Sequence, residues 1–276
     1  MTDVKFDELN SLLPYKYTLY DNANRNSDIY IKGGLVYKIY TLEDERTSSN
    51  IYTLRKLIIL KEAFANIPEI VFPNDLLTCN DKIIGFVMNE IKGKTLMEYI
   101  INNELSTEEL KSIYLKISNL ISKMKSLAFT VSIGDLHERN IIIDDSLDIH
   151  IIDPDSFIIN NKPNKYMEKD YYGEYITDGL KKSINKDELC LLAIIINQVF
   201  KDIFHGCNNV IELVRKDRRF KKLHNLIDKC KNEKGFNLEE SDINLIFDLK
   251  NQMDSNYNVE VDVYSEFKRI RNMLKG

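Results

Sequence analysis

The hydrophobic pattern of the chain changes about one third of the way along, and this change constrains the fold more than any other feature. Three early runs, rich in β-branched and aromatic residues, indicate strands: 17–20 (YTLY), 28–31 (DIYI) and 35–40 (LVYKIY). An Asn-rich turn separates the first two, and Gly33-Gly34 predicts a tight hairpin between the last two. Beyond Gly93 the apolar residues recur mostly at helical spacing. The pattern therefore predicts an α+β protein.

A single helix is expected to interrupt the strands. Residues 50–64 carry Ile51, Leu54, Leu57 and Ile58 at helical spacing, and prolines follow the segment. Further on, Asp81-Lys82 stands between Leu76-Leu77 and the apolar run 83–88, which predicts a second hairpin. The first part of the chain is thus expected to form an antiparallel sheet with one helix.

The later part of the chain is expected to be mainly helical. Ser106 and Glu109 have the spacing of a capping box. One helix face follows it, comprising Leu110, Ile113, Ile117, Leu120, Ile121, Met124 and Leu127. A helix over 187–200 is apolar nearly all round and is expected to be buried. Between these two helices, the short runs 141–143 and 149–152 are joined by Asp144-Asp145-Ser146 and predict a hairpin.

Composition narrows the class of protein. The chain has 276 residues, with 38 Lys and Arg against 43 Asp and Glu, so a net charge of -5 argues against a nucleic-acid partner. Its four cysteines are widely spaced and favour neither a zinc site nor a disulfide framework. No apolar run approaches the length that crosses a bilayer, and the N-terminus lacks the features of a signal peptide. A cytoplasmic protein with no membrane partner is therefore expected.

Polar residues with metal-ligand chemistry flank the hairpin of the helical part. Asp135, Asn140 and Asp153 surround it in the stretch IGDLHERNIIIDDSLDIHIIDPDSF. Carboxylate and amide oxygens suit Mg²⁺, which binds one or two carboxylates together with substrate phosphates. The alternative is structural, because Asn and Asp also favour turns and loop caps. We expect a metal site here, and Asp135, if it is not a ligand, is free to orient a hydroxyl and accept its proton.

The order of these motifs resembles the protein-kinase-like superfamily, which includes protein kinases and the aminoglycoside and choline phosphotransferases. The resemblance covers about residues 15–200 and implies a bilobal fold. VYKIY resembles the strand whose Lys contacts ATP phosphates, which implies that role for Lys38. MNEIKG resembles the hinge that holds adenine, with Met88 guarding the back pocket and the backbone of Asn89 and Ile91 contacting the base.

The helical part carries the rest of the resemblance. GDLHERN resembles the catalytic loop, which implies Asp135 as base or hydroxyl-positioning group and Asn140 as an Mg²⁺ ligand. IIDPDSF resembles the metal-binding turn, which implies Asp153 as the main Mg²⁺ ligand. Asp155 in that turn is either a second metal contact or a solvated turn residue. Asp187 resembles the helix residue that holds the catalytic loop in place.

Several positions depart from the family pattern. The turn DNANRNSD stands where a glycine-rich loop would cover the phosphates. The family pairs its strand Lys with a helix Glu, and here the candidates are Glu43, Glu45 and Glu62. Gly134 stands where many regulated protein kinases have Arg, and His137 where protein Ser/Thr kinases have Lys. His137 is open to two interpretations, a phosphate contact or a hydrogen bond within the loop.

These observations together predict an ATP- and Mg²⁺-dependent phosphotransferase with a strand-rich lobe over 1–91 and a helical lobe over 92–276. ATP would bind between the lobes, with Lys38 and Asp135 as catalytic residues. The first choice of acceptor is a protein Ser or Thr hydroxyl. A small-molecule hydroxyl is the alternative, because GDLH is commoner in small-molecule kinases and no APE-like segment follows. A rival hypothesis is a pseudokinase, which binds nucleotide without turnover.

Overall fold

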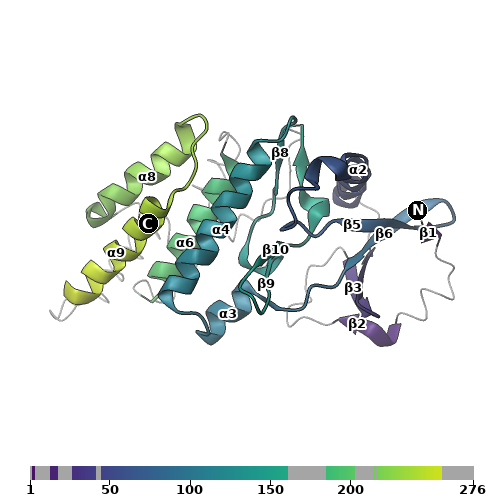
Figure 1. Cartoon of the computed structure of the whole chain (residues 1–276), viewed down its shortest axis with the longest axis horizontal. Helices are drawn as coiled ribbons and strands as arrows, with labels where there is room; N and C mark the ends of the chain where they lie inside the picture. Colours follow the sequence, from purple (N-terminus) through teal and green to yellow (C-terminus); the bar gives the residue numbers. More distant parts are fainter. Residues whose placement is uncertain are drawn as a thin grey trace, which may run out of the picture.

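The computed structural model of the chain describes residues 2–3, 13–17, 27–41, 45–160, 185–202, 214 and 217–256. The α-helices are α2 (Glu45–Leu60), α3 (Leu96–Asn102), α4 (Thr107–Lys125), α6 (Lys186–Phe200), α8 (Lys221–Asn232) and α9 (Glu240–Asn256). Helices α4, α6, α8 and α9 lie at one end of the molecule and the six-stranded sheet, with α2 beside it, at the other (Figure 1). Short 3₁₀ turns are η1 (Leu13–Tyr15), η2 (Lys61–Phe64), η3 (Glu138–Asn140), η4 (Pro154–Ser156) and η5 (Arg218–Phe220).

The largest sheet has the strand order β1-β5-β6-β4-β3-β2. All its pairs are antiparallel except β1 with β5, which is parallel. Its strands are β1 (Thr2–Asp3), β2 (Lys16–Tyr17), β3 (Ser27–Lys32), β4 (Leu35–Tyr40), β5 (Pro73–Cys79) and β6 (Lys82–Asn89). Smaller sheets contain β7 (Lys94–Thr95), β8 (Val131–Ser132), β9 (Ile141–Ile143), β10 (Ile149–Ile151) and β11 (Ile158–Ile159).

Two tight turns set the register of the large sheet. Gly33 and Gly34 connect β3 to β4 with φ of +62° and +77°, the left-handed conformation that a two-residue hairpin requires. The β5–β6 turn lies at Asn80-Asp81, also at positive φ, one residue earlier than the sequence predicted. Asn and Asp tolerate that conformation, whereas Lys82 already belongs to the strand. Most of the Asn-rich turn before β3 lies outside the described residues.

Helix α2 packs on one face of this sheet. It begins at Glu45, five residues earlier than expected, and ends at Leu60, where η2 takes over. Its buried residues Leu54 and Leu57 lie one turn apart on the face turned to the protein. Leu54 packs in a cluster with Val36, Phe86 and Met88 of the sheet. We call this group the sheet-face cluster; its remaining buried members are Val71 and Leu76.

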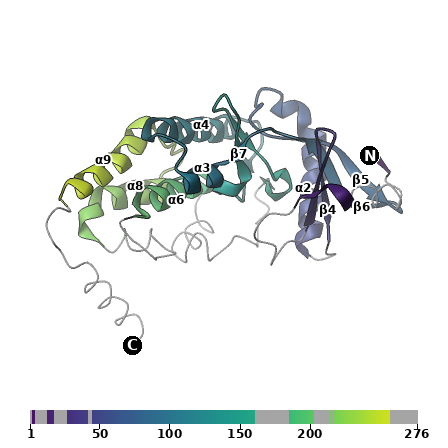
Figure 2. The same ribbon diagram turned by 90° about the horizontal axis from the view of Figure 1, so that it is seen from below.

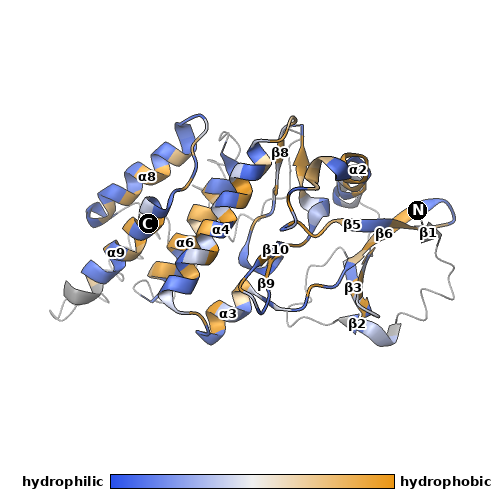
Figure 3. Cartoon of the chain, in the orientation of Figure 1, coloured by the Kyte–Doolittle hydropathy of each residue, from blue (hydrophilic) through white to orange (hydrophobic). Residues whose placement is uncertain are grey.

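The helical end of the molecule is built around α6. Nearly every residue of α6 is buried, as its all-round apolar pattern predicted, and it contacts α4, α8 and α9. Figure 2 shows these helices side by side from a second direction, and Figure 3 shows apolar colour over much of α6 while α8 carries both colours. The capping box of Ser106 and Glu109 is confirmed at the start of α4. Thr95 and Glu98 form a second box, which the sequence reasoning missed, at α3.

Strands β9 and β10 form the predicted hairpin between the two ends of the molecule (Figure 1). The segment after α2 joins it, because Ile151 N donates to Glu69 O and Val71 N to Ile151 O. These bonds attach the hairpin to the chain that leads into β5. The hairpin therefore lies where chain from the sheet part meets chain from the helical part.

The α+β class with an antiparallel sheet and several helices agrees with the prediction from sequence. The kinase-like division into lobes at residues 91 and 92 stays a prediction. Among the described helices, none combines the length and the apolar character needed to cross a membrane.

Candidate functional site

Lys38 lies at the centre of the site. It is the fourth residue of β4, and alternation along the strand places it on the same face as Val36 and Tyr40. Only 7% of the residue is exposed, and its ammonium lies 5.7 Å from the centre of the Phe86 ring. The ammonium pairs with Asp153 and, at 2.9 Å, with Asp155. Segments 115 and 117 residues apart in the chain thus meet at one charge.

The two carboxylates keep Lys38 charged. Burial acts to lower the pKa of Lys38, but Asp153 and Asp155 together outweigh it and raise the pKa above its usual value. Burial acts to raise the pKa of Asp153, but the Lys38 charge lowers it below the usual value. An ammonium facing a carboxylate is therefore the state of this pair at neutral pH.

The turn that carries both aspartates has an unusual backbone. Asp153 has φ +69° and ψ 45°, a left-handed conformation that non-glycine residues seldom adopt. Such strain, of about 1–3 kcal/mol, is common at functional sites. The Ser156 hydroxyl lies 2.8 Å from the carbonyl oxygen of Asp153 and 3.2 Å from that of Ile133. Ser156 thereby holds the turn against the loop that precedes Asp135.

Asp155 is more enclosed than a solvated turn residue would be. The residue is 1% exposed and accepts hydrogen bonds from the Tyr40 hydroxyl at 2.7 Å and from Asn50 Nδ2 at 3.0 Å. Burial raises its pKa, and the neighbouring Asp153 acts in the same direction, against the pull of Lys38. One carboxylate therefore joins strand β4, helix α2 and the η4 turn.

Asp187 holds the loop before Asp135 in the way that the resemblance implied. Both of its oxygens accept from the Ile133 amide, at 2.9 and 3.1 Å, and Oδ1 also accepts from the Gly134 amide at 3.4 Å. Burial raises the pKa of Asp187 to about 7. Gly134 itself has φ +78°, and a Cβ there would lie closer than 3.0 Å to the Ser156 carbonyl oxygen. This position therefore requires glycine and has no room for an Arg side chain.

The loop from Asp135 to Asn140 is ordered by its own side chains. The His137 ring accepts the Arg139 amide at Nδ1, so its Nε2 carries the proton and faces Asp135 Oδ2 at 3.8 Å. Asn140 Nδ2 donates to the Asp135 carbonyl at 3.0 Å, and Ile152 N donates to the Asn140 carbonyl at 3.0 Å. The hydrogen bond that the sequence offered as one interpretation of His137 is thus present.

The donor set around Asn140 and Asp153 fits a hard cation. Asn140 uses its amide nitrogen within the loop, which leaves Oδ1 with acceptor capacity, and the hairpin register brings Asn140 opposite Ile152, next to Asp153. The Asp153 side chain is 30% exposed, against 0% for Asp155. Among the described residues, no three His, Cys, Asp or Glu side chains gather as a metal-binding group. A metal here would rely on Asn140 and Asp153, with water and substrate oxygens completing the shell.

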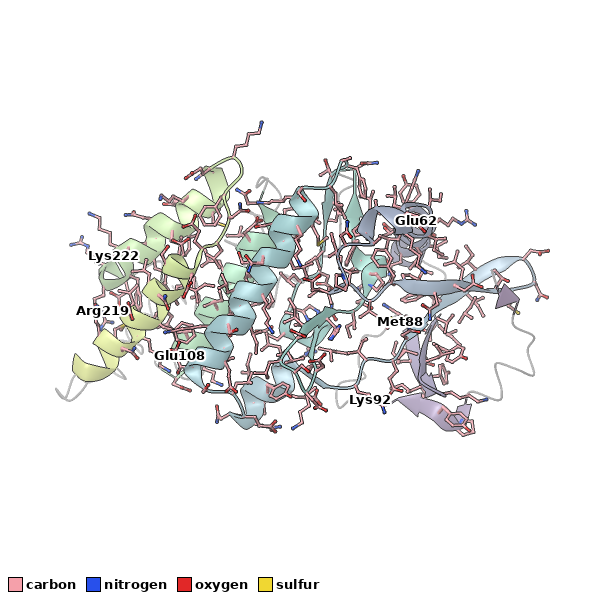
Figure 4. The ribbon with its side chains drawn as sticks, viewed as in Figure 1. Glu62, Met88, Lys92, Glu108, Arg219 and Lys222 are labelled. Carbon is pink, nitrogen blue, oxygen red and sulfur yellow. The ribbon has the colours of Figure 1, made fainter. Side chains whose placement is uncertain are left out.

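The expected hinge lies at the end of β6, and Figure 4 labels Met88 there. Met88 is buried opposite Val36 in the sheet-face cluster, and Ile91 and Ile152 pack against this cluster from outside. Glu90 N donates to Gly34 O at 2.9 Å, so this amide belongs to the sheet. Asn89 is exposed, and its side chain accepts from Asn74 at 2.7 Å. Apolar side chains from both parts of the chain therefore flank the predicted adenine contacts.

The sequence reasoning left the acidic partner of Lys38 open among three glutamates. Glu43 and the side chain of Glu45 lie outside the described part of the chain, and Glu62 lies exposed in η2, where Figure 4 labels it. The partners that the structure gives Lys38 are Asp153 and Asp155.

Three contributors to the site were not singled out from sequence: Tyr40, Asn50 and Ser156. For Tyr40 a signal existed, since it lies two residues after Lys38 on the same strand face. For Asn50 the signal was weaker, a polar residue one turn before the buried Leu54.

Neither the protein-family models nor the curated proteins searched contain a match to this sequence.

Proposed function

We propose that this chain is an ATP- and Mg²⁺-dependent phosphotransferase that moves the γ-phosphoryl group of ATP to a hydroxyl. The observation that carries the proposal is the pairing of Lys38 from β4 with Asp153 from the end of the β9–β10 hairpin. A buried lysine beside a partly exposed carboxylate suits binding of a metal and a polyphosphate together.

Each residue of the site has a role in this proposal. Asn140 and Asp153 would hold Mg²⁺, which neutralises charge on the phosphate oxygens when it is bound. Lys38 places a permanent positive charge against the phosphates. Asp135 orients the acceptor hydroxyl and accepts its proton, while His137 holds its Nε2 proton toward the same carboxylate. Asp187 and Ser156 keep the loop and the turn in register.

The adenine base would lie against the exposed edge of the sheet-face cluster. Val36 and Met88 form a cross-strand pair in that cluster, and Ile91 and Ile152 pack on it. These four side chains are apolar and come from segments on both sides of Asn89, whose backbone is expected to contact the base. Ligand pockets are lined mainly by such apolar side chains, with a few polar groups that fix the orientation of the ligand.

A protein Ser or Thr hydroxyl remains the first choice of acceptor, and a small-molecule hydroxyl the alternative. The glycine at 134 supports the alternative, because the requirement for glycine there removes the Arg through which a phosphorylated activation loop acts. The pseudokinase remains the rival for turnover, because Lys38 is engaged by both aspartates and would have to exchange one of them for a ligand.

Thermal unfolding with and without a non-hydrolysable ATP analogue and Mg²⁺ tests the binding half of the proposal. The wild type should be stabilised by the pair of ligands and Asp153→Ala should not. Asp145→Ala is the matched control, since Asp145 is an exposed aspartate in the turn of the same hairpin, and it should respond as the wild type does. A wild type that shows no shift at millimolar ligand would refute the metal-nucleotide site.

Transfer of labelled γ-phosphate tests the chemical half. Label should appear on a hydroxyl acceptor with the wild type and be lost with Asp135→Asn, while that variant keeps its thermal response to the analogue. Binding without transfer to any acceptor would favour the pseudokinase.

A further inference from the structure

Asp155 receives hydrogen bonds from three side chains on two elements. Its Oδ1 accepts from Lys38 at 2.9 Å, and its Oδ2 accepts from Tyr40 at 2.7 Å and from Asn50 at 3.0 Å. Tyr40 and Lys38 belong to β4, and Asn50 belongs to α2. Thr53, one turn further along α2, donates to the Phe157 carbonyl at 3.2 Å. Helix α2 is therefore bonded to the η4 segment at two successive turns.

The neighbouring carboxylate is placed differently. Asp153 lies two residues earlier, its backbone is left-handed, and its side chain is 30% exposed. Lys38 contacts both, so one ammonium is shared by one partly exposed and one enclosed carboxylate.

A divalent cation would meet very different resistance at the two carboxylates. To bind Asp155 it must displace Lys38, Tyr40 or Asn50 from a residue that is only 1% exposed, and a buried donor left without its acceptor is destabilising. Among the described residues, the side-chain hydrogen bond that Asp153 accepts comes from Lys38, so a cation there displaces Lys38, which keeps its second partner.

We infer that Asp155 is a positioning residue: it holds Lys38, Tyr40 and helix α2 together, so that the Lys38 ammonium stays in the site when a divalent cation takes Asp153. This inference rests on the proposed function for its ligand and assigns Asp155 a role other than metal binding. It also explains why helix α2 can carry Asn50 instead of an acidic residue that pairs with Lys38. The acid comes from Asp155 in the η4 turn, and the helix supplies the Asn50 amide.

The experiment measures two quantities for the wild type, Asp153→Asn and Asp155→Asn. The first is the Mg²⁺ concentration that half-saturates the thermal response at a fixed ATP-analogue concentration; the second is the Kd of the analogue at saturating Mg²⁺. Asp153→Asn should raise the half-saturating Mg²⁺ concentration by about tenfold or more, as expected for loss of about 1.4 kcal/mol of ligation. Asp155→Asn should leave the half-saturating Mg²⁺ concentration within about threefold of the wild-type value. It should weaken analogue binding by about tenfold, the effect of one charge-assisted hydrogen bond.

The Lys38→Met background separates positioning from direct contact. If Asp155 acts through Lys38, Asp155→Asn should have little further effect on analogue affinity in that background. An equal loss in both backgrounds, or a rise in half-saturating Mg²⁺ that matches Asp153→Asn, would overturn the inference. Asn50→Ala keeps both charges and removes one donor, so it should shift analogue affinity in the same direction and serves where Asp155→Asn does not fold.

A measurement without ligand distinguishes the two proposals. A double-mutant cycle of Lys38 and Asp155 in urea should give a coupling of at least about tenfold in the unfolding equilibrium constant. Absence of coupling would refute the positioning role even in a protein that binds Mg²⁺ and the analogue. Strong coupling in a protein that binds neither would refute the proposed function and support the role of Asp155 in holding Lys38.

Discussion

Replacement of Gly134 by Ala tests how closely the catalytic loop approaches the η4 turn. Gly134 has φ +78°, and an added Cβ would lie within 3.0 Å of the backbone oxygen of Ser156. The left-handed conformation costs a residue with a Cβ about 1–2 kcal/mol. Forcing packed atoms apart costs a further ~1–3 kcal/mol. The free energy of unfolding of Gly134→Ala should therefore fall by about 2–5 kcal/mol, from these two sources together.

Gly34 supplies a matched control. Its φ is +77°, nearly the same as that of Gly134, but nothing lies within 4 Å of the position of an added Cβ. Gly34→Ala should therefore lose only the backbone contribution, about 1–2 kcal/mol. The difference between the two variants isolates the close approach to Ser156.

Urea denaturation measures both variants. The chain has no tryptophan, so far-UV circular dichroism and the fluorescence of its 15 tyrosines are the signals to follow. Gly134→Ala should unfold at a clearly lower urea concentration than Gly34→Ala. If the two losses agree within about 0.5 kcal/mol, the usual spread between independent sites, the steric reasoning is refuted.

Three further predictions concern other parts of the scaffold. Burial raises the pKa of Asp187 to about 7, above its unfolded value, so this group stabilises the fold at low pH and loses that contribution as pH rises toward 7. The free energy of unfolding in urea, measured from pH 4.5 to 7.5, should therefore change less with pH in Asp187→Asn than in the wild type. Equal pH dependence in the two proteins would contradict this prediction. Ser106→Ala removes the cap of α4 and should lower the free energy of unfolding by about 1 kcal/mol in the same assay, with no loss if the cap is not formed. Gly85→Ala places a Cβ against the backbone oxygen of Lys38, so it should lower the free energy of unfolding by about 1–3 kcal/mol. It should also weaken the thermal response to Mg²⁺ and ATP analogue. An unchanged response would show that β4 tolerates the displacement.

Much of the local architecture could be predicted from the sequence. The Gly33-Gly34 turn, the α4 capping box and the hairpin of β9 and β10 depend on residues within a few positions of each other. Their turn and cap chemistry is therefore visible in short windows of sequence. The boundary errors also have local causes: Asn80-Asp81 competes with Asp81-Lys82 as a turn, and both pairs contain a turn-forming residue.

The residues around Lys38 could be predicted only in part. Lys38, Asn140, Asp153 and Asp187 were expected from the resemblance to the kinase-like superfamily, and the structure brings Lys38 to Asp153 and Asp187 to the loop before Asp135. The position of Asp155 could not be resolved from sequence, because a carboxylate in a turn can face either solvent or protein. In the structure it faces protein, where Lys38, Tyr40 and Asn50 donate to it, and these contacts come from distant segments.

The sequence by itself determined which chemical groups the protein has and where the chain turns, because propensity, periodicity and capping act over a few residues. Only the tertiary structure decided which acid pairs with Lys38. Its two partners, Asp153 and Asp155, lie 115 and 117 residues away, on a turn that packs against β4 and α2. The same packing explains why Gly134 must be glycine: the residue that excludes a Cβ there is Ser156, which no local pattern connects to it. Contacts between distant segments are chosen by burial of charge and by available space, and these exist only once the chain has folded.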